Sequence, residues 1–180
     1  IKSYEIQRNP SNFLKYNLFL LYGENYGLKK DIREVIKNEI KKSDSNVELL
    51  SLYEKDIIEN EDDFYNSIYS GSLFGNKKII TIYESTDKII EKINDVYKKY
   101  SENIYLIFFS EILEKKSKLR NFFEKNEKTI CIPCYLDSEK DLEIIALLEL
   151  KKNNIILSRE AINLLIEKSN LDRNNLKNEI

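Results

Sequence analysis

Two glycines and two lysines stand where a phosphate-binding loop would stand. The run Gly23-Glu24-Asn25-Tyr26-Gly27-Leu28-Lys29-Lys30 follows an apolar run and precedes an amphipathic segment. A phosphate-binding loop of the G-x-x-x-x-G-K-[ST] type has its lysine directly after the second glycine and a hydroxyl residue next. Here three residues separate the glycines, no Ser or Thr follows Lys29, and Glu24 adds a negative charge. The pattern favours a strand-to-helix turn on a nucleotide-binding type of scaffold, without a bound cofactor.

The end of a second apolar run, residues 104–109, gives a matching indication. An ATPase of this class carries an acidic pair there, which holds Mg²⁺ and polarises the attacking water. In this chain Ser110 takes the usual metal-coordinating position and only Glu111 is acidic. Two eroded motifs at corresponding places indicate an ATPase-like fold that has lost its chemistry. The alternative is a nucleotide-dependent α/β enzyme with a degenerate phosphate loop, which titration with Mg-ATP would reveal.

The two cysteines form a C-x-x-C pattern, Cys131-Ile132-Pro133-Cys134. A redox pair needs its first cysteine at a helix N-terminus, where the thiol pKa is lowered, but Cys131 falls inside a predicted strand. A zinc site would need two further ligands, and the sequence has no histidine and no other cysteine. We expect both to be buried strand cysteines. An oxidoreductase is the alternative, which thiol titration would test.

A basic cluster occupies the start of a helix predicted over residues 113–125. Its cationic members are candidates for contact with DNA or with an acidic subunit surface: Lys115, Lys116, Lys118 and Arg120. The alternative is a solvated helix face. The whole chain has 29 basic and 31 acidic residues, and this balance argues against a grip on nucleic acid that is spread over the entire surface.

The segment Ser70-Gly71-Ser72-Leu73-Phe74-Gly75 places two large apolar residues in a predicted turn. Leu73 and Phe74 either fold back into the core or remain on the surface for a pocket on a partner. Burial of each side chain in such a pocket would contribute roughly 1.5–3 kcal/mol. A paired aliphatic and aromatic anchor on a short turn is typical of interfaces that concentrate their binding energy.

Apolar runs and amphipathic segments alternate through most of the chain. Strands are expected over residues 18–22, 47–53, 79–83, 104–109 and 129–132. Between them, helical spacing is found over residues 26–40, in a short helix capped by Asp62 or Asp63, after Asp87, and over residues 113–125. This alternation predicts an α/β fold with right-handed crossovers and a mostly parallel sheet flanked by helices. The order of the strands cannot be read from the sequence.

The character of the sequence changes after Pro133. Helices are expected to begin at Ser138, at Ser158 and near Asp172, and no strand is expected beyond Leu157. We therefore expect an α/β domain over residues 1–137 and the start of a helical domain, truncated, over residues 138–180. The longest apolar run, residues 104–109, is too short to span a bilayer, so no membrane partner is expected. Reduced thiols are consistent with a cytoplasmic protein.

With these residues in place, the chain resembles the delta subunit of the bacterial DNA polymerase III clamp loader. The resemblance runs through almost the whole chain and rests on the order and spacing of several short stretches. They are residues 19–24, Ser72-Leu73-Phe74-Gly75 with Lys77-Lys78-Ile79-Ile80 after it, residues 106–108, Lys116-Ser117-Lys118-Leu119, Cys131 with Pro133, and residues 161–179.

The resemblance implies an AAA+ architecture without a working ATP site, in a subunit with no catalytic activity of its own inside a DNA polymerase (nucleotidyltransferase) holoenzyme. It implies that Leu73 and Phe74 enter a pocket on the sliding clamp, while Ser72 and Gly75 shape the turn. The clamp then opens and is placed around primed DNA, and other subunits hydrolyse ATP. The implied partners are the sliding clamp (the beta subunit), the other clamp-loader subunits, and DNA within the complex. Residues 138–180 would begin the lid domain, and the family's third domain, its collar, would be missing.

Overall fold

The computed structural model describes residues 3–70, 77–99 and 101–180. A five-stranded sheet lies at the centre, in the order β2-β3-β4-β1-β5, and every pairing between neighbours is parallel. The strands are β1 (Leu18–Tyr22), β2 (Val47–Tyr53), β3 (Lys77–Tyr83), β4 (Ile104–Ser110) and β5 (Thr129–Pro133). The predicted α/β class is confirmed, and the structure adds the strand order.

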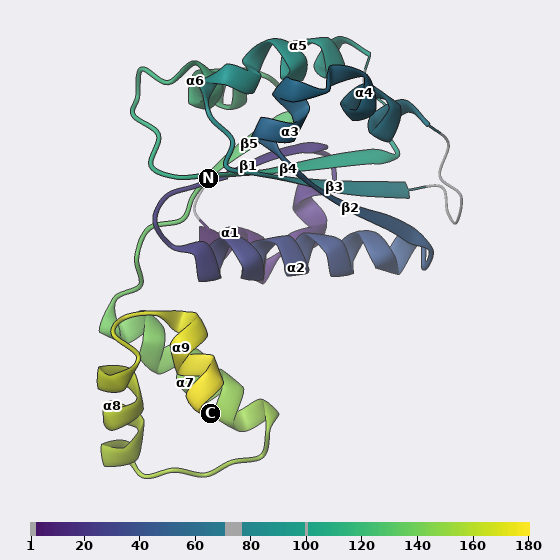
Figure 1. Cartoon of the computed structure of the whole chain (residues 1–180). Coiled ribbons are helices and arrows are strands. Elements are labelled where there is room, and N and C mark those ends of the chain that lie inside the picture. The colour runs from purple at the N-terminus through teal and green to yellow at the C-terminus, as the bar shows by residue number, and fades with distance from the viewer. Residues whose placement is uncertain (1–2, 71–76, 100) are drawn as a thin grey trace.

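Helices cover both faces of the sheet (Figure 1). On one face lie α1 (Ser3–Arg8), the short 3₁₀ turn η1 (Pro10–Phe13) and α2 (Tyr26–Ser43). On the other face lie α3 (Glu54–Glu59), α4 (Glu61–Tyr69), η2 (Asp87–Ile89), α5 (Ile90–Lys98) and α6 (Lys118–Lys125). None of the helices in these described ranges, or in the C-terminal helices below, is long and apolar enough to cross a membrane.

The continuous apolar run of β1 follows from this layering. Leu18 and Leu20 belong to the apolar cluster under α3–α6, whereas Phe19 and Leu21 belong to the cluster under α1 and α2. Successive side chains of a strand point to opposite faces, so a strand with both faces covered must be apolar at every position. All five residues of β1 are buried.

Beyond β5 the chain forms three helices with an apolar cluster of their own (Figure 1). These are α7 (Glu139–Lys152), α8 (Arg159–Lys168) and α9 (Arg173–Glu179), here called the three-helix unit. Each begins at a side-chain cap that the sequence indicated: Ser138, Ser158 and Asp172. The Ser138 cap is a full capping box, because Asp141 also accepts a hydrogen bond from the Ser138 backbone N–H.

Two predicted helix starts were wrong by several residues. Asn60, and not Asp62 or Asp63, caps α4, because its side chain accepts a hydrogen bond from Asp63 N. The helix predicted from residue 113 begins only at Lys118, where Ser117 is the cap. The Asp87 carboxylate accepts hydrogen bonds from Ser117 Oγ and from the N–H groups of Lys118 and Leu119, which fixes the helix start at this point.

Candidate functional site

The predicted partner-binding residues Ser72, Leu73, Phe74 and Gly75 lie outside the described residues. The structure does describe what precedes and follows them. Helix α4 ends at Tyr69 with Ser70 as its C-cap, and β3 begins at Lys77. The segment between them therefore connects a helix on one face of the sheet to an internal strand.

A buried lysine, Lys78, joins these two ends. Its Nζ donates hydrogen bonds to the carbonyl oxygens of Ser67, at 2.7 Å, and Ser70, at 3.2 Å. It also lies 3.8 Å from Glu48 Oε2 on the neighbouring strand β2. The carboxyl end of a helix favours a cation, so the Lys78 ammonium suits the last carbonyls of α4. Sequence reasoning missed this role, although a lysine at the start of an apolar strand run was a signal.

The two eroded nucleotide motifs meet at the carboxyl ends of β1 and β4. Lys29 is 1% exposed, and its Nζ donates to the carbonyl oxygens of Gly23, at 2.8 Å, and Ser110, at 2.9 Å. The same Nζ lies 3.3 Å from Glu111 Oε1. Three protein oxygens therefore take the three N–H groups of the Lys29 ammonium. The Ser110 hydroxyl is also engaged, since it donates to the carbonyl oxygen of Ser85 at 2.5 Å.

At both glycines of the strand-to-helix turn, atoms of other residues of the chain pack so closely that they leave no room for a Cβ. Gly23 has φ +125°, and a Cβ on it would lie 2.4 Å from the carbonyl oxygen of Cys134. A Cβ on Gly27 would lie 2.5 Å from Cγ of Arg173. In phosphate-binding loops, glycine lets the backbone approach the phosphates of the ligand. Here the close approach is made by protein backbone at one glycine and by a side chain at the other.

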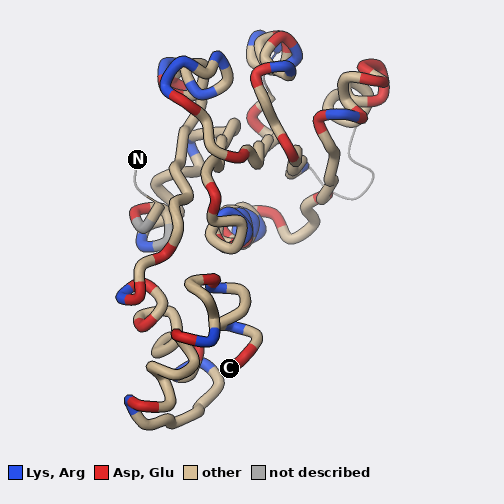
Figure 2. The backbone as a smooth tube through the Cα atoms, turned by 60° about the vertical axis from the view of Figure 1, so that its left-hand side comes forward, with Lys and Arg blue, Asp and Glu red and all other residues tan. Residues whose placement is uncertain are grey.

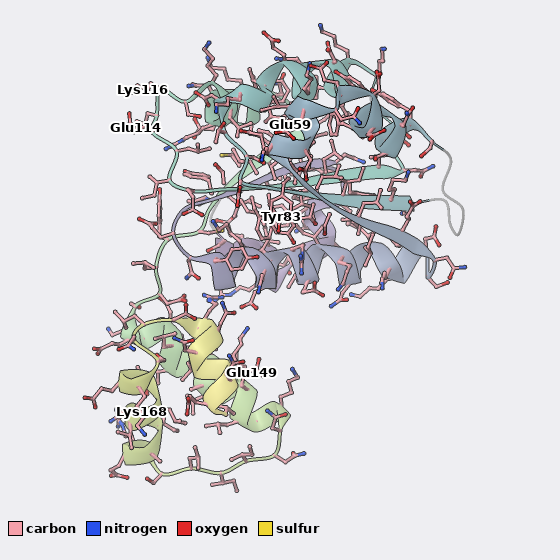
Figure 3. The ribbon with its side chains drawn as sticks, in the orientation of Figure 1. Glu59, Tyr83, Glu114, Lys116, Glu149 and Lys168 are labelled. Carbon is pink, nitrogen blue, oxygen red and sulfur yellow. The ribbon has the colours of Figure 1, made fainter. Side chains whose placement is uncertain are left out.

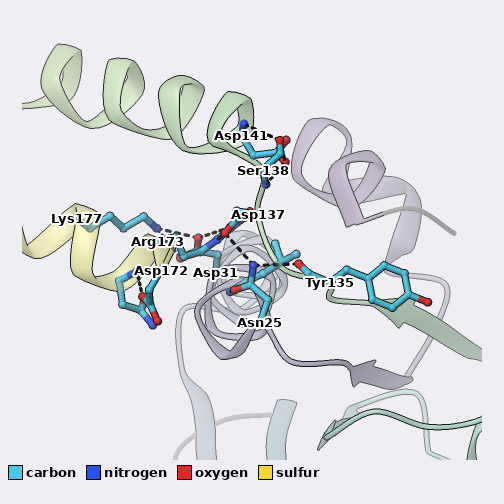
Figure 4. Close-up of polar contacts among 11 residues, drawn as sticks. Asn25, Asp31, Tyr135, Asp137, Ser138, Asp141, Asp172, Arg173 and Lys177 are labelled. Atoms are coloured by element: carbon cyan, nitrogen blue, oxygen red, sulfur yellow. Dashed lines mark hydrogen bonds and ion pairs between the residues drawn. The ribbon is translucent and has the colours of Figure 1, made fainter. Parts of the chain in front are cut away.

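Arg173, the first residue of α9, connects the three-helix unit to the α/β part (Figure 4). Its Nε donates to Asp137 Oδ2 at 2.8 Å, its Nη2 donates to Asp137 Oδ1, and its Nη1 donates to Asp31 Oδ2 at 2.8 Å. Lys177 donates to both oxygens of Asp31, at 2.7 and 2.8 Å. Burial disfavours the guanidinium charge, but the hydrogen bonds and charges of Asp137 and Asp31 outweigh it and raise the pKa of Arg173.

A small aromatic cavity remains at the carboxyl edge of the sheet, where ligands of open α/β folds bind. Its volume is about 250 Å³, below the 300–1,000 Å³ that is usual for small-molecule sites. It is lined by Tyr26, Lys29, Tyr53, Tyr83, Glu84, Phe109 and Glu111. Figure 3 shows Tyr83 between the sheet and α2.

The basic cluster divides into two parts. Lys115, Lys116 and Lys118 are exposed, and Lys116 Nζ lies 2.9 Å from Glu114 Oε2 on the loop before α6 (Figure 3). Arg120 is more enclosed. Its Nε pairs with Glu124 at 2.8 Å, its Nη1 donates to the carbonyl oxygen of Leu113, and its guanidinium lies 5.1 Å from the centre of the Tyr22 ring. Figure 2 shows acidic residues interspersed with the basic ones over the helices.

Both cysteines are free thiols. Cys131 is a half-buried residue of β5, and Cys134, predicted as a strand residue, lies just past the strand end and is fully buried. Burial raises the pKa of both thiols to about 12. In the described part of the chain, no group of three or more histidine, cysteine or acidic residues is arranged to hold a metal ion.

No protein-family model matches the chain. Over 150 residues the chain is 28% identical to the probable DNA polymerase III subunit delta of Rickettsia prowazekii, which corresponds to 82% of this chain and 44% of that protein. The chain thus spans less than half the length of this curated relative.

Solved structures extend the likeness to the fold. The Bacillus subtilis DNA clamp loader delta protein matches with a TM-score of 0.61 and 13% identity, covering 98% of this chain and 55% of that one. The replication initiator DnaA bound to AMPPCP and single-stranded DNA matches with a TM-score of 0.63 and 19% identity, covering 98% of this chain and 58% of that one. The sequence match and the fold lead to one conclusion: the chain resembles the DNA polymerase III delta subunit in its sequence, and its architecture is that of AAA+ proteins.

Proposed function

We propose that this chain acts as a delta subunit of a DNA polymerase III clamp loader, which binds and opens the sliding clamp during replication. The observation that carries the proposal is the sequence similarity to a probable delta subunit over 150 residues, together with the fold likeness to a clamp loader delta protein. The partners would be the sliding clamp, the other loader subunits and DNA within the assembled complex, in the cytoplasm.

The clamp-binding residues in this proposal are Leu73 and Phe74, presented by Ser72 and Gly75. Both described ends of the segment that carries them are held by Lys78. An α/β domain of residues 1–137 would carry this turn, and residues 138–180 would begin the lid domain. Opening is a shift of population: a clamp whose open form is rare opens when a partner binds that form more tightly. No covalent step by this chain is needed.

The chain would perform this work without hydrolysing ATP, which other loader subunits would do. Two features support this part of the proposal. Lys29 has protein oxygens as partners, and both glycines of the turn are packed against protein atoms, which at Gly27 include those of Arg173. A phosphate chain could enter this turn only if these contacts were broken.

The clamp-binding role of Leu73 and Phe74 is tested with the double variant Leu73→Ala, Phe74→Ala and surface plasmon resonance on immobilised sliding clamp. Loss of two buried apolar side chains should weaken binding roughly 100-fold or more. The matched control is Leu147→Ala, Leu148→Ala, which removes two exposed apolar side chains from α7 and should bind as the unchanged chain does. The melting temperature of the Leu73, Phe74 variant should stay the same. A much lower melting temperature would show that the pair belongs to the core, and the proposed clamp-binding role of Leu73 and Phe74 would be disproved.

Nucleotide independence is tested separately by isothermal titration with Mg-ATP. The DnaA structure of the same fold contains AMPPCP, so nucleotide binding is the relevant alternative for this architecture. We expect no binding heat with this chain. Micromolar affinity would overturn this part of the proposal and favour a nucleotide-dependent protein.

A further inference from the structure

The joint between the α/β part and the three-helix unit is built on one buried cation. The Arg173 side chain is 6% exposed and the Asp137 side chain 4%, and the guanidinium grips both carboxylate oxygens of Asp137 while its third nitrogen reaches Asp31 on α2. A bidentate arginine–carboxylate pair fixes the relative orientation of the two side chains as well as the distance between them. Asp137 belongs to the segment between β5 and α7, so the pair holds the connection itself.

The Asp137 carboxylate also lies at the amino end of α2. Asn25, the N-cap of α2, accepts a hydrogen bond from Leu28 N and donates from Nδ2 to Asp137 Oδ2 at 2.8 Å (Figure 4). The amino end of a helix attracts anions, and in many α/β proteins a ligand phosphate is the anion found there. In this chain a carboxylate from the segment after β5 supplies the negative charge.

The aliphatic part of the Arg173 side chain packs on Gly27. A Cβ on Gly27 would lie only 2.5 Å from Arg173 Cγ and 2.9 Å from Asn174 Nδ2. The arginine therefore lies directly on the strand-to-helix turn and takes the room above it. The chain itself therefore supplies all three parts. Asp137 is the anion, Arg173 is the cation that binds it, and Gly27 permits the close approach.

We propose that Arg173 and Asp137 act as a built-in substitute for a bound phosphate ligand, and that Arg173 is the positioning residue that holds the three-helix unit in one orientation on the α/β part. The joining contacts are all made between residues of the chain, so the orientation is set by the fold and not by a ligand. This inference goes beyond the proposed function and does not depend on the identity of the partner.

The test measures the distance between the two parts by pulsed electron paramagnetic resonance. Spin labels are placed on exposed residues of α2 and α8, as Asn38→Cys and Asn163→Cys, in a chain with Cys131→Ala and Cys134→Ala. We expect one narrow distance distribution that millimolar Mg-ATP leaves unchanged. Arg173→Gln should replace it by a broad distribution. Arg173→Lys, which can bind one carboxylate but cannot span two, should give an intermediate width.

The matched control is Lys168→Gln, which removes an exposed cation from α8 and should leave the distribution narrow (Figure 3). Hydrogen exchange of β1 and β4 amides shows whether each variant keeps its sheet. If Arg173→Gln does not fold, Asp31→Asn, whose side chain is partly exposed, weakens only the contacts of Asp31 and should still broaden the distribution. A narrow distribution at the original distance in whichever of these two variants folds, or a shift of the unchanged chain with Mg-ATP, would overturn the proposal.

Discussion

The Lys78 ammonium lies 2.7 Å from the carbonyl oxygen of Ser67, and this contact ties the carboxyl end of α4 to the beginning of β3. The same nitrogen reaches Ser70, the last described residue before the predicted clamp-binding turn. One buried cation thus holds both ends of the segment in which Leu73 and Phe74 lie. The residue that joins the described ends of this segment belongs to the sheet.

Replacement of Lys78 by methionine should therefore affect both stability and binding. The carbonyl oxygens of Ser67 and Ser70 would lose their cation, and so would Glu48, whose buried Oε2 has no hydrogen-bond partner in the described part of the chain. Unpaired buried polar groups cost roughly 1–3 kcal/mol each, so urea denaturation should report a clear loss of unfolding free energy. Clamp affinity, measured by surface plasmon resonance, should fall as well.

The adjacent Lys77→Met is the control for Lys78→Met. Lys77 Nζ donates an exposed hydrogen bond to Ser43 Oγ, so its loss should change stability little. If Lys78→Met were as stable as Lys77→Met and bound the clamp equally well, the anchoring role of Lys78 would be refuted.

The Asp87 carboxylate should contribute acid-sensitive stability. Burial raises the pKa of Asp87, but hydrogen bonds from Ser117, Leu119 and Lys118 outweigh burial and lower it below the usual value. Because the folded pKa is the lower one, this stability is present above the unfolded pKa of about 3.9 and is lost as the pH falls through the folded pKa. Asp87→Ala should cost about 1–2 kcal/mol at neutral pH, as the loss of a helix cap does.

Urea denaturation at a series of pH values between neutral and about 2 checks the Asp87 prediction. The difference between Asp87→Ala and the unchanged chain should shrink as the pH falls below about 4. Asp62→Ala, which removes an exposed carboxylate from the first turn of α4, is the control. A difference that is independent of pH would mean that Asp87 acts by packing and not by charge.

The two thiols should be unreactive in the folded chain, and they should make it less stable in base. Burial raises the pKa of Cys131 and Cys134 to about 12, whereas an exposed thiol ionises near 8.5. The folded state then holds more protons, so stability from the thiols is complete below the unfolded pKa and falls as the pH rises toward 12. A Cys131→Ala, Cys134→Ala variant should show a shallower fall.

Labelling with a thiol reagent near pH 8 gives the simplest readout for the cysteines. Reaction should be slow in native buffer and complete in denaturant. Rapid reaction of either thiol in the folded chain would contradict the prediction and return the redox alternative to consideration.

The basic cluster should separate into binding and structural members. A variant with Lys115→Ala, Lys116→Ala and Lys118→Ala removes exposed charges and should keep its stability within about 0.5 kcal/mol. Arg120→Ala loses the pair with Glu124 and the contact with the Tyr22 ring, and it should melt at a lower temperature. If the lysines meet DNA, the salt dependence of DNA binding by the assembled loader should become weaker in the lysine variant. An unchanged salt dependence would exclude that contact.

Much of the fold follows from short-range patterns in the sequence. The run at residues 18–22 predicted β1 correctly because a strand covered on both faces is apolar throughout. Ser138, Ser158 and Asp172 predicted helix starts because a cap satisfies N–H groups only two or three residues away. In contrast, α3 was not predicted. Its buried Glu54 is held by Thr86, whose N–H and hydroxyl both donate to the carboxylate.

The site could be predicted only in part. Gly23 and Gly27 correctly indicated a strand-to-helix turn, but no residue near them in the sequence indicates which groups pack against it. Lys29 finds its partners at Ser110 and Glu111 only once β1 and β4 are paired. Arg173 reaches Asp31 only after the three-helix unit has packed on α2. Contacts between segments so far apart depend on the arrangement of whole elements, which no local pattern encodes.

Because β1 lies inside the sheet, between β4 and β5, it can pair with its neighbours only after these later strands have been synthesised. Leu18 pairs with Leu106 of β4 on one side and with Thr129 of β5 on the other. Of the five described strands β1 is made first, and it is therefore without these strand neighbours until most of the α/β part has been made, while β2 and β3 can already pair. Such long-range pairing slows folding and leaves apolar strands exposed in the meantime. The most apolar strand is thus the one that a nascent chain must protect for longest.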